Sequence, residues 1–145
     1  MDPLPTLDPK APLDVLLAEV IRHFRAETGT IHLAENGVLV LKAVHGAFPP
    51  PVLDAIRSIP WGKGMAGLAA ERRDAVTVCN LQTDTSGDVR PGAKATGMEG
   101  AIAVPMFAAD GAVRGTLGIA NRAAREWTKS ESDALMTCGR IIAAR

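Results

Sequence analysis

Residues 99–121 read Glu99-Gly-Ala-Ile-Ala-Val-Pro-Met-Phe107, then Ala-Ala-Asp-Gly111, then Ala-Val-Arg-Gly-Thr-Leu-Gly-Ile-Ala-Asn121, and this stretch decides the fold. Two apolar runs flank the pair Asp110-Gly111. An Asp-Gly pair tolerates the positive φ angles of a type I′ turn. The stretch therefore predicts an antiparallel hairpin of two long strands.

The two runs of this hairpin alternate in side-chain size rather than in polarity. Successive residues of a strand point to opposite faces of a sheet. One face therefore carries bulky side chains, namely Ile102, Val104, Met106, Val113, Leu117 and Ile119. The other carries small ones, namely Ala101, Ala103, Thr116, Gly118 and Ala120. The bulky face suits a packed core, and the small face leaves room for closely packed backbone or for a ligand.

Composition narrows the class of protein. The 145 residues include 16 basic and 16 acidic side chains, which gives a formal net charge of zero. This balance argues against a nucleic-acid or anionic-membrane partner, because either one favours a basic patch. No apolar run approaches the roughly 18 residues of a membrane span, and the first residues show no signal-peptide pattern. Cys79 and Cys138 are interpreted as reduced thiols, with a disulfide or a redox pair as the alternative, so we expect a cytoplasmic protein.

The segment before residue 50 predicts a helix and a second hairpin. Residues 1–10 are proline-rich and are expected to form a flexible arm, with the domain spanning residues 11–145. Apolar residues at helical spacing predict a helix over Leu13–Phe24, which Gly29 is expected to stop. Asn36-Gly37 predicts a tight turn between strands at residues 30–34 and 38–44.

Short helices at residues 52–59 and 65–72 and a strand at 75–79 are expected next. Residues 80–97 form a long polar segment with one helical turn near Ala93. Loops of this length in compact domains are commonly functional lids, and a plain crossover connection is the alternative. A capping box, Thr128-Lys-Ser-Glu131, opens the last helix. Strands joined by hairpins, with helices to their sides, indicate an α+β fold.

The order of these predicted elements, with the motifs that they carry, resembles the GAF domain family over about residues 13–144. The segments that carry the resemblance are Gly62–Gly67, Ala75–Leu81, Gly97–Pro105, Gly111–Asn121 and Trp127–Glu131. The resemblance implies a PAS-like central antiparallel sheet, with terminal helices on one face and a lid-covered pocket on the other. Many GAF domains dimerise through their first and last helices and regulate an output domain.

Three functional subtypes of the family can be compared with these residues. The motif of cyclic-nucleotide-binding members is matched at Asn121, Arg122, Trp127, Glu131 and Ser132, where only the asparagine is kept and the final acid is lost. Bilin-binding members use a lid cysteine, and residues 80–97 contain none. Relatives of free methionine-(R)-sulfoxide reductase use cysteines in the glycine-rich turn and the lid. Here the turn holds Met65 and Ala66, and Cys79 precedes the lid, so a reductase is the least favoured reading.

The sequence predicts a sensory domain that binds a small molecule over the small face of the hairpin. The predicted ligand-binding residues are Trp61, Met65 and Ala66 in the turn, Asp84, Arg90 and Thr96 in the lid, and Ala101, Ala103, Thr116 and Gly118 in the hairpin. No catalytic arrangement stands out, and His23, His32 and His45 lack a metal-ligand spacing. The ligand or cofactor is not identified by the sequence.

Two apolar helical stripes, Leu13–Phe24 and Leu135–Ile142, predict a homodimer, because one sheet face does not readily cover both. Signalling through these helices to an attached or separate output domain is expected from the resemblance. The alternative function is a dimerisation module whose pocket is degenerate.

Overall fold

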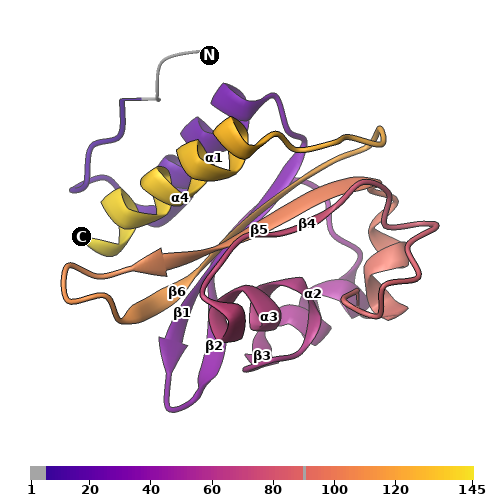
Figure 1. Ribbon diagram of the computed structural model, residues 1–145, viewed down its shortest axis with the longest axis horizontal. Coiled ribbons are helices and arrows are strands. Elements are labelled where there is room, and N and C mark those ends of the chain that lie inside the picture. The colour runs from indigo at the N-terminus through magenta and orange to yellow at the C-terminus, as the bar shows by residue number, and fades with distance from the viewer. Residues whose placement is uncertain (1–5, 90) are drawn as a thin grey trace.

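The computed structural model describes residues 6–89 and 91–145, and its centre is a six-stranded antiparallel sheet (Figure 1). The elements are α1 (Leu13–Phe24), β1 (Thr28–Glu35), β2 (Val38–His45), α2 (Pro50–Ile56), β3 (Ser58–Pro60), α3 (Gly64–Arg72), β4 (Val76–Val78), the 3₁₀ helix η1 (Pro91–Thr96), β5 (Gly100–Phe107), β6 (Val113–Asn121) and α4 (Lys129–Ala143). The sheet order is β3-β2-β1-β6-β5-β4. The predicted α+β class is confirmed.

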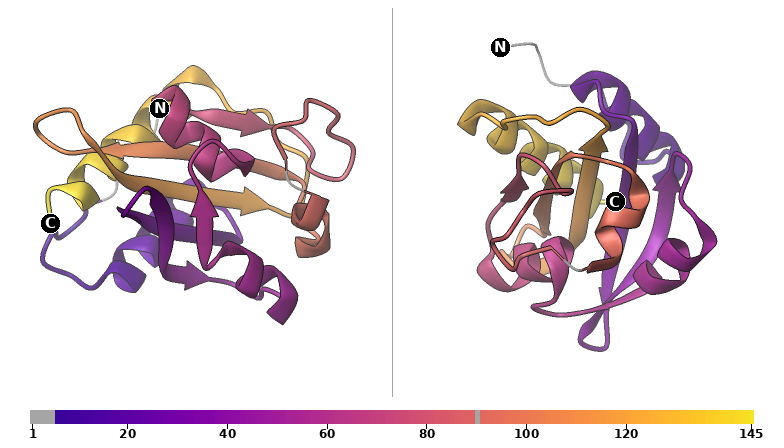
Figure 2. Two further views of the ribbon diagram at one scale, coloured as in Figure 1. Left: turned by 90° about the horizontal axis from the view of Figure 1, so that it is seen from below. Right: turned by 90° about the vertical axis from the view of Figure 1, so that its right-hand side faces the viewer.

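Helices cover the two faces of the sheet in two separate groups. Helices α1 and α4 lie side by side on one face, and α2, α3 and η1 lie on the other (Figures 1 and 2). The main core fills the space under α1 and α4, and its buried members include Leu16, Leu17, Val20, Ile102, Val104, Met106, Leu117, Leu135 and Ile142. The predicted bulky face of the hairpin therefore forms this core, with one exception.

The exception is Val113, which a β-bulge moves to the other face. The register shifts between Met106, which pairs with Gly115, and Phe107, which pairs with Val113. An extra residue on one strand reverses the alternation beyond it. Val113 therefore packs against the buried cluster of Leu39, Ile59 and Ala70 rather than the main core.

The turn at Asp110-Gly111 also differs from the prediction. Gly111 has a φ of +85°, but Asp110 is not among the described residues with positive φ, so the turn is not type I′. The strands end earlier, and the N–H of Ala108 donates to the carbonyl of Ala112 at 2.8 Å. The Asp110 carboxylate accepts from the N–H of Ala112 at 3.0 Å. By contrast, the tight turn predicted at Asn36-Gly37 is present, and its φ values of 50° and 83° are those that a type I′ turn requires.

Two helix boundaries differ from the predictions. Helix α1 ends at Phe24, because Arg25 adopts a left-handed conformation with φ 57°. Gly29 lies within β1, where an added Cβ would lie 2.8 Å from both the Gly118 carbonyl oxygen and Ile21 Cδ1. Gly29 thus lets α1 approach the sheet rather than ending the helix. Helix α2 ends at Ile56, and residues 58–60 form the edge strand β3 on β2 instead of a last helical turn.

The remaining elements follow the sequence predictions closely. Helix α3, strand β4 and the helical turn near Ala93 are present. The capping box is complete, with Thr128 Oγ1 accepting from the Glu131 N–H at 3.1 Å and the Glu131 carboxylate accepting from the Thr128 N–H at 2.9 Å. Of the predicted arm, residues 1–5 lie outside the described residues, and Leu7 packs against the main core. None of the helices described between residues 6 and 145 has the length and hydropathy needed to cross a membrane.

Candidate ligand-binding cavity

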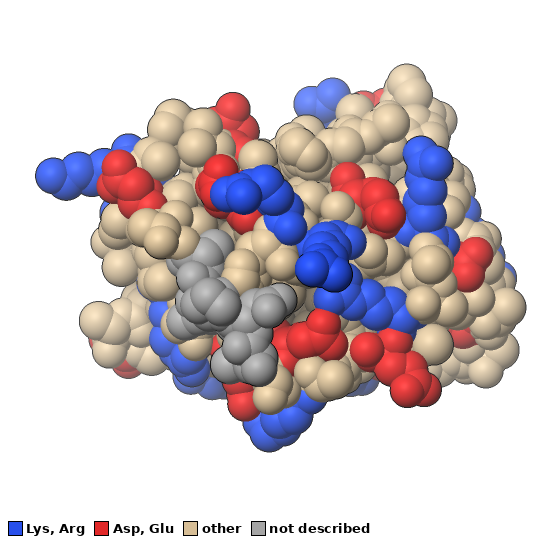
Figure 3. Space-filling view, turned by 90° about the horizontal axis from the view of Figure 1, so that it is seen from above, with Lys and Arg blue, Asp and Glu red and all other residues tan. Residues whose placement is uncertain are grey.

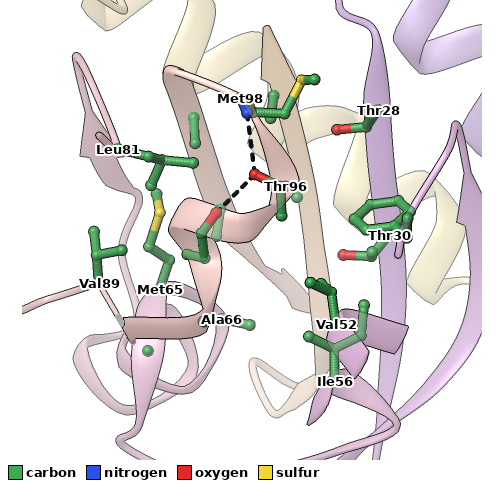
Figure 4. Close-up of a pocket in the computed structure, with 18 of the residues that line it drawn as sticks. Thr28, Thr30, Val52, Ile56, Met65, Ala66, Leu81, Val89, Thr96 and Met98 are labelled. Atoms are coloured by element: carbon green, nitrogen blue, oxygen red, sulfur yellow. Dashed lines mark hydrogen bonds between the residues drawn. The ribbon is translucent and has the colours of Figure 1, made fainter. Parts of the chain in front are cut away.

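A cavity of about 400 Å³ opens on the sheet face opposite α1 and α4. Its floor is formed by β1, β5 and β6, and its walls by α2, the first turn of α3 and the segment from Leu81 to Met98 (Figure 4). The apolar wall residues include Val52, Ile56, Met65, Leu81, Val89 and Met98. A mostly apolar cavity with a few polar groups is the usual form of a small-molecule site.

Small residues on the central strands keep the floor of the cavity open. Gly118 of β6 pairs with Thr30 of β1, and Ala101 of β5 pairs with Ala120 of β6. A Cβ added to Gly118 would come no closer than 3.5 Å to any neighbour. The small face of the hairpin thus leaves free volume, as its sequence predicted.

Helix α3 covers the other part of the small face. Ala103 packs in a buried cluster with Ala69 and Val76, and Met65 and Leu68 pack against that cluster. Gly67 lets α3 pack closely on the turn that precedes it, because an added Cβ would lie 2.6 Å from the Pro60 carbonyl oxygen. Ala103 still borders the cavity, but Thr116 is buried at 1% exposure and does not line it.

The other predicted site residues divide between the cavity wall and the surface. Met65, Ala66, Thr96, Ala101 and Gly118 line the cavity together with Ala103. Trp61 is 38% exposed and lies outside it, because the turn ahead of α3 directs Lys63 and Gly64 to the cavity instead.

The lid residue Asp84 is likewise not part of the cavity wall. Its carboxylate accepts from the N–H and the hydroxyl of Ser86, so the group is used within its own loop. Arg90 lies outside the described residues.

Hydrogen bonds hold the predicted lid in place. Gln82 Nε2 donates to the carbonyls of Lys94 and Met98 at 3.1 and 2.9 Å. Thr96 Oγ1 donates to the Ala93 carbonyl at 2.7 Å and accepts from the Met98 N–H at 3.1 Å (Figure 4). Arg72 and Asp88 form a two-pronged ion pair at 3.0 and 3.1 Å, which ties the segment to α3. The predicted lid is therefore held in place by hydrogen bonds and forms one wall of the cavity, in addition to connecting β4 to β5.

Thr28 and Thr30 are polar residues of the cavity that the sequence reasoning missed. Both hydroxyls point into the cavity, and Figure 4 marks no hydrogen bond from either to the other residues drawn. The expected strand began only at residue 30. Polar residues occupy the alternate positions 28, 30 and 32, which share one face of a strand. This pattern could have predicted a polar row on that face.

His32, the third residue of that row, is 2% exposed and joins β1 to α2. Its Nε2 lies 2.8 Å from the Ile56 carbonyl oxygen, and its Nδ1 is buried without a partner. Burial lowers the pKa of His32, although the hydrogen bond to the Ile56 backbone acts in the opposite direction. The ring is therefore neutral at pH 7, with the proton on Nε2, where it can be donated to the carbonyl.

Charge is sparse in the cavity and mixed on the surface. Among the described residues that line the cavity, Lys63 is the one charged side chain, and it is exposed. Over the face that carries α1 and α4, basic and acidic side chains are interspersed (Figure 3).

Three of the residues matched to the cyclic-nucleotide motif, Asn121, Trp127 and Glu131, take part in a network of contacts away from the cavity, called the brace below. Asn121 Nδ2 donates to the Arg25 carbonyl at 2.7 Å. Arg125, not the matched Arg122, pairs with Glu131 at 2.6 Å. Arg125 also donates to the Phe24 carbonyl and to Asn121 Oδ1, and its guanidinium lies 3.9 Å from the centre of the Trp127 ring. This group joins the end of α1, the end of β6 and the start of α4.

Neither cysteine lines the cavity. Cys79 is exposed after β4, and Cys138 is buried in α4 on the opposite side of the sheet. Burial raises the pKa of the Cys138 thiol to about 11, which keeps it protonated. Within residues 6–89 and 91–145, no group of three or more His, Cys, Asp or Glu side chains is placed to hold a metal ion.

Comparison with solved structures identifies several chains with this fold. The GAF domain of a phosphoenolpyruvate-protein phosphotransferase from Coxiella burnetii has a TM-score of 0.75 and 19% identity, over 91% of this chain and 78% of that one. Free methionine-R-sulfoxide reductase from Neisseria meningitidis, in complex with its substrate, has a TM-score of 0.73 and 21% identity, over 90% and 73%. A putative GAF sensor protein from Burkholderia vietnamiensis has a TM-score of 0.69 and 21% identity, over 94% and 84%.

No curated protein matches the chain. A family model described as a GAF domain matches residues 6–144, which is nearly the whole sequence. The family resemblance drawn from the sequence is therefore confirmed, and the chain belongs to the GAF domain family.

Proposed function

We propose that this chain is a regulatory GAF domain that binds a small molecule in the cavity above β1, β5 and β6. The observation that carries the proposal is the cavity itself, about 400 Å³ in volume. A module with a degenerate pocket would have its lid packed over the whole small face of the hairpin. Here the lid residues Leu81 and Met98 pack against Ala101, but Gly118 still borders the cavity, with no neighbour closer than 3.5 Å to an added Cβ. The similar protein from Neisseria meningitidis is described in complex with its substrate, which also supports binding in this fold.

We propose that the domain binds its ligand and does not use a cysteine thiol for catalysis. Similar structures include free methionine-R-sulfoxide reductases, which are enzymes. A thiol catalyst needs a reactive thiolate that reaches its substrate. In this chain Cys79 lies outside the cavity wall, and Cys138 is buried behind the sheet with a raised pKa. We therefore expect no reduction of free methionine-R-sulfoxide in the presence of a thiol reductant, and measurable turnover would contradict this part of the proposal.

The same proposal covers the cellular compartment of the domain and the route by which it passes on a signal. Both cysteines are free thiols, which is typical of a reducing compartment, and we place the protein in the cytoplasm. Binding in the cavity would be read out through α1 and α4, which pack on the other face of the same three strands. The output domain, attached or separate, would receive the signal from these helices.

Thermal unfolding in the presence of small molecules from the source organism tests the proposal. A ligand that binds only the folded state raises the unfolding temperature. We expect such a rise with the low-molecular-weight fraction of a cell extract. Gly118→Phe should remove the rise, because its side chain would enter the open space on the floor of the cavity. Thr77→Phe places the same ring on the exposed side of β4 and should keep the rise. Equal rises in all three proteins would place binding outside the cavity.

A further inference from the structure

The Thr28 and Thr30 hydroxyls form a short polar row along the β1 side of the cavity floor (Figure 4). The two residues are two positions apart on β1, so their Cα atoms are separated by about 6.6 Å. The surfaces around them are apolar, with Gly118 and Ala120 on the neighbouring strand β6 and Ala101 on β5 beyond it. A molecule that fills the cavity therefore meets polar partners along one edge.

The structure holds the Thr28 hydroxyl toward the cavity. Thr28 is 6% exposed, and its methyl group lies against the backbone of Gly46. A Cβ added to Gly46 would lie 2.7 Å from Thr28 Cγ2, so the glycine makes room for that methyl group. Because the methyl group is held on this side, the hydroxyl faces the cavity.

Gly118 leaves room beside the second hydroxyl. A Cβ added to Gly118 would lie 3.5 Å from Thr30 Oγ1, which is ordinary contact distance. With glycine at this position, that space is free for a ligand atom. Each hydroxyl can both donate and accept a hydrogen bond, so the row suits hydroxyl, carbonyl or ring N–H groups alike.

Resting on the proposed function, we propose that this site takes an uncharged, ring-bearing molecule whose polar edge hydrogen-bonds to the Thr28 and Thr30 hydroxyls. The apolar walls favour a ring, because a rigid ring buries apolar surface at a small cost in conformational entropy. A buried charge needs a partner, and the one charged side chain among the described lining residues is the exposed Lys63.

Three naphthalene probes of similar size test this chemistry by calorimetric titration. Naphthalene supplies the ring alone, 2-naphthol adds an uncharged polar edge, and 2-naphthoate adds a negative charge. We expect 2-naphthol to bind roughly two- to tenfold more tightly than naphthalene, as one additional hydrogen bond gives. We expect 2-naphthoate to bind more weakly than 2-naphthol.

Isosteric variants connect this preference to the two threonines. Thr28→Val and Thr30→Val replace each hydroxyl with a methyl group of similar size. Each should reduce the preference for 2-naphthol over naphthalene while the affinity for naphthalene is kept. Thr77→Val is the matched control, because Thr77 is an exposed strand threonine outside the cavity wall, and it should leave all three affinities unchanged. Gly118→Ala should weaken all three probes, because its methyl group occupies space beside Thr30.

The possible outcomes separate this inference from the proposed function. Equal binding of naphthalene and 2-naphthol, or a preference that survives both valine variants, would overturn the role of the hydroxyls and leave the cavity as a binding site. Tighter binding of 2-naphthoate would overturn the uncharged class. Failure of all three probes would overturn the ring-bearing class, and the extract experiment above would still decide whether the cavity binds a molecule.

Discussion

The Nε2 atom of His32 lies 2.8 Å from the carbonyl oxygen of Ile56, and this contact fixes the end of α2 against β1. Both residues line the cavity. This contact holds one wall of the cavity against its floor, together with the hydrogen bond from the Leu41 N–H to the Arg57 carbonyl at 2.9 Å. Protonation of this ring would place a positive charge in a buried site whose second nitrogen has no partner.

Stability should consequently fall in mildly acidic solution because of His32. Its pKa is lowered in the folded state, chiefly by burial, whereas an unfolded histidine titrates near 6.5. Below about pH 6.5 the unfolded state therefore binds more protons than the folded state. The contribution of the neutral His32 ring to the free energy of unfolding is complete above that pH and is progressively lost as the pH falls. Unfolding temperatures measured between pH 7.5 and 5 should fall less in His32→Gln than in the wild type. His45→Gln, at an exposed position, serves as the control, and parallel curves for wild type and His32→Gln would contradict the assignment.

Arg125 should matter more to stability than its neighbour Arg122. The Arg125 guanidinium donates to Phe24, Asn121 and Glu131, whereas only the backbone N–H of Arg122 donates to Glu27. Lysine keeps the charge but loses the planar fork. Arg125→Lys should lower the free energy of unfolding by roughly 1–3 kcal/mol, since hydrogen bonds with charged partners are of that size. Urea denaturation of Arg125→Lys beside Arg122→Lys checks this, and equal midpoints would show that the brace is not formed in solution.

The capping box should contribute to stability at the start of α4. Thr128 Oγ1 accepts a hydrogen bond from the Glu131 N–H at 3.1 Å. Thr128→Ala removes that acceptor and should cost about 1 kcal/mol. The denaturation midpoint should shift accordingly, while Thr77→Ala, outside any helix, gives the baseline for loss of a threonine. An unchanged midpoint in Thr128→Ala would mean that the helix begins elsewhere.

The predicted homodimer would use the outer surfaces of α1 and α4. Most of the apolar stripe named from the sequence, including Leu17, Val20 and Leu135, is buried against the sheet. Val15 of α1 remains 47% exposed and is available to a second copy. Sedimentation at tens of micromolar protein should show a dimer that Val15→Glu weakens. A monomer at every concentration would remove the prediction.

Apart from the turn at Asp110-Gly111, local sequence patterns predicted the features of the fold that depend on neighbouring residues. The alternation of Ile102, Val104 and Met106 with Ala101 and Ala103 assigned both faces of β5, because strand geometry alone sets that alternation. Asn36-Gly37 and Thr128–Glu131 determine their turn and cap by local hydrogen bonds and φ angles. The floor of the cavity was predicted for the same reason, since glycine and alanine leave volume wherever a sheet is formed.

Features that depend on distant contacts were not predicted. The bulge that moves Val113 is set by pairing between β5 and β6, which the residues of β6 alone do not show. The start of β1 at Thr28 follows from its pairing with Ala120, so the polar row inside the cavity was missed. Trp61 was expected in the wall because of its apolar ring, but the turn before α3 leaves it 38% exposed.

Native mass spectrometry of the protein purified from its source organism tests the central claim most directly. Gentle ionisation preserves a bound molecule, and denaturation releases it for identification. We predict a mass above that of the bare chain for the wild type, lost on denaturation, and no such addition for Gly118→Phe, whose side chain would fill the floor of the cavity. The same added molecule on the wild type and on Gly118→Phe would contradict the account, because the binding site would then lie outside this cavity.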